Sequence, residues 1–265
     1  MERTRFGRYV AAVVLVWAIA SVNVFWVGGA TLYSASMQER RESLHRAVLS
    51  GELPAGVGSW NEVGANTAAL RPAVPWLAEQ TASVTGLRLA TAYQLIEWTS
   101  IAIAIAMLFL ILHRFVSLER ALIGCLYVGV VLPLSYMAHY FQPWDKPALA
   151  LWLAAAFLLL TDAVIPAGAV IALAVLVKFD AVVLPALYML LYAGRGKASR
   201  FATRSAYLWL TALVPFALLQ WLRPGASEPR HPVGQLTANA GVFREMWYAY
   251  PPMIGFLLPS GSARS

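Results

Sequence analysis

The sequence predicts an all-α fold, a polytopic membrane helix bundle of about seven membrane segments, and three observations lead to it. Of its 265 residues, 60% are hydrophobic and only 12% are charged, whereas soluble domains carry about 25% charged residues. Long apolar runs recur along the chain. Basic residues gather in short segments beside these runs, as topology signals do. Because of this placement, the net charge of +7 indicates membrane orientation rather than a nucleic-acid partner.

The first apolar run, residues 9–30, follows three arginines near the N-terminus. It is longer than the roughly 7–15 apolar residues of a signal peptide, so we expect a retained membrane helix. Three later runs, residues 90–112, 118–138 and 206–222, are each near the ~20 residues that a membrane helix needs. We therefore expect each of them to span the membrane.

Residues 31–88 form the longest polar stretch and are predicted to be an extracytoplasmic loop. Two amphipathic helices are expected in it, over residues 36–49 and 67–84, both resting on the membrane surface. The predicted apolar residues of the second helix are Leu70, Val74, Trp76 and Leu77.

Three shorter apolar runs, residues 147–160, 164–177 and 181–193, hold only 13 or 14 residues each. At ~1.5 Å per residue they fall short of the ~30 Å hydrocarbon core. A helix break at residues 178–180 keeps the charged residues there out of the bilayer centre. The break also leaves the net charge of +4 over residues 195–204 on the cytoplasmic side, with the outer segments neutral.

This topology predicts a cytoplasmic N-terminus and a membrane domain over residues 1–223. The tail, residues 224–265, is expected on the extracytoplasmic side. The chain stops where another membrane segment could begin, so a fragment of a longer protein is an open alternative.

Ionisable residues at the predicted outer ends of the short runs form a candidate site, because charges at membrane depth face a cavity, a partner or the interface. Asp145 is a candidate general base or cation ligand. The alternative is a solvated carboxylate at a helix start, with Trp144 as an interface anchor. Lys178 suits phosphate binding, and Asp180 is expected at the same outer crevice. The alternative is that Lys178 and Asp180 only reach the interface to end short helices.

Three more residues are weaker candidates. Glu97 lies roughly two turns inside a predicted span, where a lone carboxylate is costly, so it must be protonated, paired or water-exposed, and Lys178 is a possible partner. A role in substrate binding and a buried pair that only fixes helix packing are both open. Arg71 suits bidentate phosphate binding or a lipid-headgroup contact. His139 and Asp145 lack the spacing of a metal site. No cofactor is therefore expected, with a divalent cation as the alternative.

Two short motifs follow the order of a known family. Pro143-Trp144-Asp145 begins a short helix, and Lys178-Phe179-Asp180 leads into an apolar run that ends in proline. With the loop segment ending at residues 71–77, this order resembles bacterial multi-pass proteins related to the C-type membrane glycosyltransferases. The resemblance covers roughly residues 9–193.

The resemblance implies transfer of a sugar from a polyprenyl-phosphate donor at the outer face of the bacterial cell membrane. It implies that Asp145 is a site carboxylate and that Lys178 and Arg71 hold the donor phosphate. Such enzymes usually carry an aspartate early in the first outer loop. The loop here has none, and Glu39 and Glu42 are its nearest substitutes.

Two other functions remain open on the sequence alone. The absent loop aspartate and the abrupt C-terminus also fit a noncatalytic or truncated partner of another membrane protein. A transporter or lipid translocator would use Glu97 and Lys178 as intramembrane relays, although no inverted repeat is visible.

Overall fold

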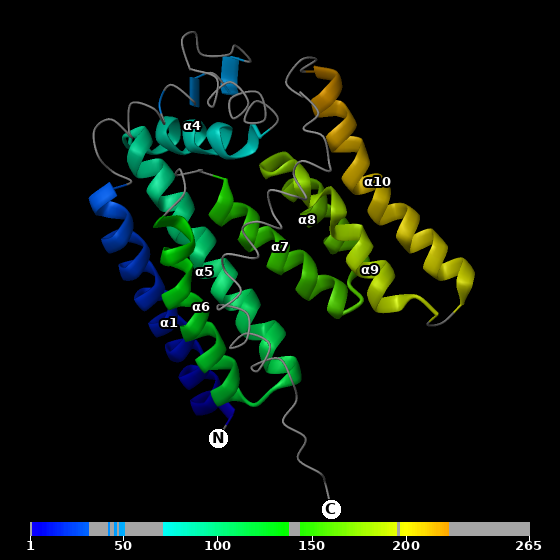
Figure 1. Cartoon of the computed structure of the whole chain (residues 1–265), viewed down its shortest axis with the longest axis horizontal. Helices are drawn as coiled ribbons and strands as arrows, with labels where there is room; N and C mark the ends of the chain where they lie inside the picture. Colours follow the sequence, from blue (N-terminus) through cyan, green and yellow to red (C-terminus); the bar gives the residue numbers. More distant parts are fainter. Residues whose placement is uncertain are drawn as a thin grey trace, which may run out of the picture. The chain divides into compact units, whose positions relative to one another are not determined.

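Every element of the described chain is a helix, which confirms the all-α prediction. The structure, a computed structural model, describes residues 2–31, 42, 45–46, 48–50, 71–137, 144–194 and 197–222. The chain divides into the units Met1–Ala226 and Ser227–Ser265, and all described residues belong to the first. The elements, labelled in Figure 1 where space allows, are α1 (Glu2–Thr31), α4 (Ala73–Thr85), α5 (Leu89–Phe115), α6 (Leu118–Met137), α7 (Asp145–Leu160), α8 (Val164–Val177), η1 (Phe179–Val183), α9 (Leu184–Tyr192) and α10 (Ala198–Leu222).

Two helices of the described chain, α5 with 27 residues and α10 with 25, are long and apolar enough to cross a membrane. At ~1.5 Å per residue both exceed the ~30 Å hydrocarbon core. Helices α7 and α8 hold 16 and 14 residues and are shorter than a span, as their run lengths predict. All seven predicted membrane segments overlap helices of the structure.

The helices form two packed groups (Figure 1). Helices α1, α5 and α6 contact one another around a core that includes Val16, Ile101, Phe109 and Cys125. Helices α7, α8, α9 and α10 enclose a second apolar core. Contacts between α5 and α7 join the two groups, and α4 packs on α5 and α8. One end of α7 and one end of α8 therefore lie close to α4 and the first turns of α5.

A helical hairpin made by α7 and α8 determines where the charged residues go. Pro147 and Pro166 lie in the first turn of their helices, where a missing N–H breaks no helical hydrogen bond. Between the helices, Asp162 takes the left-handed conformation with a φ of 58° and reverses the chain. The start of α7 and the end of α8 thus share the Asp145 end of the hairpin. The Asp162 end is the opposite end of the hairpin. It lies about 21 Å away, the length of the 14-residue helix α8 at ~1.5 Å per residue.

The predicted break at residues 178–180 is confirmed. Helix α8 ends at Val177, and Lys178 has an extended backbone with a φ of −153° and a ψ of 109°. A short 3₁₀ segment, η1, follows it, and Pro185 then opens α9. The break keeps the side chains of Lys178 and Asp180 at the Asp145 end and lets the chain return along α9.

The amphipathic helix predicted over residues 67–84 begins later, at Ala73, and residues 67–70 lie outside the described part. Its buried face holds Val74 and Ala78, which are four residues apart and therefore lie on one side of the helix. Trp76 and Leu77 are exposed. Val74, Pro75 and Ala78 are buried against the neighbouring helices, so α4 buries Val74 of the predicted apolar residues and exposes Trp76 and Leu77.

Candidate functional site

The Asp145 end of the hairpin gathers a cluster of ion pairs. The Nζ atom of Lys178 lies 3.2 Å from Oδ1 of Asp145 and 3.6 Å from Oδ2 of Asp180. The side chains of Asp145, Lys178 and Asp180 are 21%, 28% and 47% exposed. The hairpin explains why Asp145 and Lys178 lie together, since it brings the first residue of α7 beside the residue that follows α8. All three side chains are partly exposed at this end.

Arg71, which precedes α4, joins the same cluster. Its guanidinium carbon lies 4.9 Å from the ring centroid of Trp144 and 5.2 Å from that of Phe179, within cation–π range. Burial lowers the pKa of Arg71, while the carboxylates of Asp180 and Asp145 act in the opposite direction. An arginine remains charged despite such a shift. Two cations and two carboxylates therefore balance in the cluster.

Trp144 does not face the membrane interface. Its side chain is buried, 3% exposed, and packs with Val74, Tyr93 and Ala148. The alternative that made it an interface anchor was wrong, because the start of α7 is covered by α4 and α5. The tryptophan instead supports the guanidinium of Arg71 from within the protein.

A second ion pair lies deeper at the same end. The Nζ atom of Lys146 donates to Oε2 of Glu97 at 2.8 Å, and the two side chains are 5% and 1% exposed. Of the three states left open for Glu97, the structure shows an ion pair, but with Lys146 and not with the suggested Lys178, which contacts the aspartates. Successive helical residues point about 100° apart, so Lys146 turns toward α5 when Asp145 faces the end of α8.

His45 is a buried polar residue that the sequence did not single out. One ring nitrogen, Nδ1, lies 2.8 Å from the hydroxyl of Tyr93, and the other, Nε2, lies 2.9 Å from Oε2 of Glu79. The histidine is 4% exposed. It ties a segment of the long loop to α4 and α5. The sequence offered one signal: His45 lies three residues before the apolar Val48, a spacing that places both on one helical face. Both residues are buried.

The remaining predicted residues lie apart from the cluster or outside the described chain. Glu42 is exposed, and its main-chain carbonyl accepts a hydrogen bond from Nε of Arg46 at 3.4 Å. Glu39 and His139 lie outside the described residues. Within the described ranges, no group of three or more histidine, cysteine or acidic residues could hold a metal ion. The predictions for metal and cofactor are not tested by this observation.

The chemical capacity of the cluster follows from its groups. A carboxylate such as Asp145 can accept a proton from a hydroxyl, and Lys178 and Arg71 can bind phosphate. The partial exposure of Asp145 and Lys178 leaves them able to exchange one ionic partner for another.

Comparison with known protein families, curated proteins and solved structures finds no match for this chain.

Proposed function

We propose that this chain is an integral membrane glycosyltransferase-like protein that uses the Asp145 end of the hairpin as its site. The donor is a polyprenyl-phosphate sugar at the extracytoplasmic face of a bacterial cell membrane. One observation carries the proposal: Lys178 lies 3.2 Å from Asp145, with Arg71 over the neighbouring aromatic rings. Phosphate-binding cations and a carboxylate thereby share one partly exposed location.

The proposed topology has seven membrane segments and a cytoplasmic N-terminus. Its support is the charge difference between the two ends of the hairpin. At the Asp145 end, Lys178 and Arg71 balance two carboxylates. At the Asp162 end, three cations, Lys197, Arg200 and Arg204, accompany one carboxylate. An excess of basic residues favours the cytoplasmic side, so the Asp145 end faces outward.

The proposed reaction assigns each group a step. The hydroxyl oxygen of the acceptor attacks the anomeric carbon of the sugar, and its proton passes to Asp145. The bond from the anomeric carbon to the phosphate oxygen breaks, and polyprenyl phosphate leaves with the bonding electrons. Lys178 and Arg71 stabilise the negative charge that builds on the leaving phosphate. A bound phosphate competes with Asp145 for Lys178, and this competition frees the carboxylate for proton transfer.

The direct test is Asp145→Asn in the full-length chain. The purified protein is reconstituted in proteoliposomes with a radiolabelled polyprenyl-phosphate hexose, and a membrane lipid extract serves as the acceptor pool. Loss of a general base lowers rates by roughly 100-fold or more, so we expect transfer by the variant to fall by that factor. The matched control is Glu119→Gln, which neutralises an exposed carboxylate at the start of α6.

Equal transfer by wild type and Asp145→Asn would remove Asp145 from the reaction. Circular dichroism and gel filtration of both variants separate loss of activity from loss of folding. Transfer that falls in both variants to the same extent would mean that a general charge effect, and not the site, is responsible.

A noncatalytic partner subunit is the second candidate function. The observation that favours it is the internal balance of the cluster, because Lys178 already contacts two carboxylates, as in a purely structural ion network. This function predicts that wild-type protein shows no transfer with any polyprenyl-phosphate hexose. It also predicts that the protein co-purifies with another membrane subunit in a fixed ratio.

A further inference from the structure

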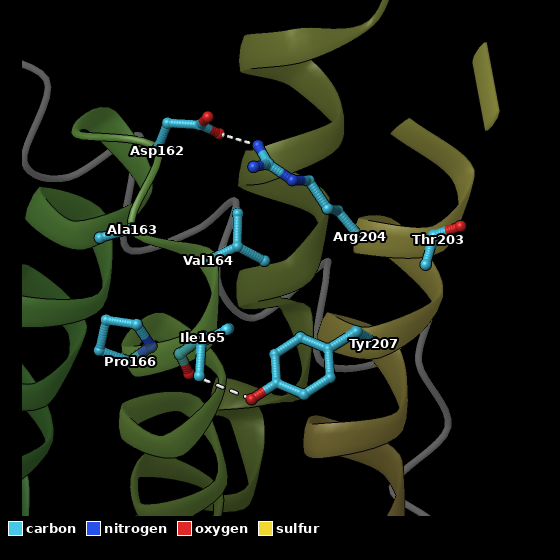
Figure 2. Close-up of a pocket in the computed structure, with 8 residues that line it drawn as sticks. All are labelled: Asp162, Ala163, Val164, Ile165, Pro166, Thr203, Arg204 and Tyr207. Atoms are coloured by element: carbon cyan, nitrogen blue, oxygen red, sulfur yellow. Dashed lines mark hydrogen bonds and ion pairs between the residues drawn. The ribbon is translucent and has the colours of Figure 1, made fainter. Parts of the chain in front are cut away.

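Two cavities meet at the Asp162 end of the hairpin, opposite the candidate site. The first, of about 490 Å³, lies between the start of α8 and α10, and Figure 2 shows its lining. The second, of about 540 Å³, is lined by residues of α9 and α10 and by Lys197. Asp162 and Arg204 line both cavities, and their ion pair stands where the two meet.

The second cavity has an excess of positive charge. Asp162 forms ion pairs with Arg204 and, at 3.8 Å, with Arg200. The exposed Lys197 lines the same cavity, so three cations face a single carboxylate. Arg200 is 68% exposed, and its guanidinium can turn toward a ligand. The charge complement of this cavity is an anion.

Aromatic side chains form the walls of this charged cavity. The rings of Tyr188 and Tyr192 stack at 4.8 Å, and those of Tyr188 and Phe201 stack at 5.9 Å. The Tyr192 hydroxyl donates to the main-chain carbonyl of Leu159 at 2.9 Å, which fixes its ring. The cavity therefore combines cations with rigid apolar walls, and this combination suits a headgroup next to a hydrocarbon chain.

The first cavity is predominantly apolar. Figure 2 shows Val164, Ile165 and Pro166 along one side, with the ring of Tyr207 opposite. The Tyr207 hydroxyl donates to the Ile165 carbonyl at 3.1 Å, so its polar atom is satisfied and its ring is presented to the groove. Ile165 is 77% exposed although it is a large apolar residue. Its side chain is therefore open to contact with an apolar ligand.

We propose that the two cavities together bind one anionic membrane phospholipid. Its phosphate lies between Lys197 and Arg200, and one acyl chain follows Ile165 and Tyr207 along the groove between α8 and α10. Two independent observations support a lipid: the charged and the apolar cavity adjoin at Asp162 and Arg204, and α10 is one of the membrane-length helices. Basic pockets at the cytoplasmic end of membrane helices suit acidic headgroups. This site does not depend on the proposed transferase activity.

The test measures which lipids the full-length protein retains. The protein is placed in nanodiscs of mixed phosphatidylcholine and phosphatidylglycerol, and bound lipids are counted by native mass spectrometry. We expect Lys197→Gln/Arg200→Gln to weaken retention of phosphatidylglycerol about 30-fold, with phosphatidylcholine unchanged. The matched control is Arg114→Gln/Arg120→Gln, which removes two cations from exposed positions of α5 and α6. An equal loss in this control would overturn the site.

A second arm separates a lipid from a free phosphate. Ile165→Trp narrows the apolar cavity without changing its charge, and we expect it to reduce retention of phosphatidylglycerol severalfold. Inorganic phosphate at millimolar concentration should leave the bound lipid in place. Full displacement by inorganic phosphate, with no effect of Ile165→Trp, would show an anion site without a lipid and would overturn the proposal.

Discussion

At the Asp145 end of the α7–α8 hairpin, Lys146 and Glu97 are shut away from solvent, with side chains 5% and 1% exposed. At the Asp162 end, the carboxylate and its two arginines, Arg200 and Arg204, are 40%, 68% and 25% exposed. Both ends pair a carboxylate with basic side chains: Lys146–Glu97 joins α7 to α5, and Asp162, between α7 and α8, pairs with two arginines of α10. Burial is what differs between them.

This difference determines what each ion pair can contribute. A buried charge that loses its partner carries a large desolvation penalty, so removal of one partner costs about 3–5 kcal/mol. An exposed pair is screened by water and salt and contributes about 0.2–1 kcal/mol. The first arrangement holds α5 against α7, whereas the second leaves its cations available for a ligand. The Asp145–Lys178 pair, with side chains 21% and 28% exposed, lies between these extremes.

The largest expected effect follows from Lys146→Met. This change leaves Glu97 buried without its cation, and we expect the free energy of unfolding to fall by about 3–5 kcal/mol. Reversible unfolding of the protein in mixed detergent micelles, followed by circular dichroism, measures this change. Adding Glu97→Gln should recover most of the loss, because the stranded charge is then removed.

The same substitution at the Asp162 end provides the comparison. Lys197 is exposed, and Lys197→Met should change the free energy of unfolding by no more than about 0.5 kcal/mol. Equal losses in Lys146→Met and Lys197→Met would abolish the distinction between the two ends. A small loss in Lys146→Met would mean that groups other than Lys146 stabilise the Glu97 carboxylate.

A smaller loss of stability is expected from Gly168→Ala, because α8 and α10 pack closely at Gly168. A Cβ atom on Gly168 would lie 2.5 Å from the Tyr207 ring, so Gly168→Ala must displace that ring or separate α8 from α10. Overpacking of this kind costs about 1–3 kcal/mol. Thermal unfolding of Gly168→Ala measures it. Gly7→Ala is the control, since nothing lies within 4 Å of its added Cβ and the stability should not fall.

The hairpin and its break could be predicted from the sequence because run length and charge position constrain them together. Residues 164–193 cannot form one span without placing Lys178 mid-bilayer, and the extended backbone at Lys178 agrees with that argument. The meeting of Asp145 with Lys178 then follows from chain reversal alone. The number of membrane spans does not follow from run length alone, since two helices of the described part, α5 and α10, are both long and apolar enough to cross a membrane.

The partner of Glu97 could not be predicted, because it depends on the rotation of α7 about its axis. The sequence assigned Lys146 to an outer polar segment with Asp145, although adjacent helical residues face different neighbours. His45 was missed for a related reason: the loop helix was expected to lie on the membrane, whereas it is bound to Tyr93 and Glu79. The partners of Glu97 and His45 depend on contacts between segments that are distant in the sequence, and a single sequence carries no record of such contacts.

The smallest expected effect concerns Asp162, whose backbone has a φ of 58°. Asparagine tolerates this left-handed conformation as well as aspartate does, so Asp162→Asn removes the charge without adding backbone strain. We expect the free energy of unfolding to fall by about 0.2–1 kcal/mol at low salt and by less at high salt, because exposed pairs are screened. The loss in Lys146→Met should be independent of salt, since its partner is buried. A salt-independent loss in Asp162→Asn would mean that the Asp162–Arg204 pair is shielded from water, and the two ends of the hairpin would then be held by the same physical means.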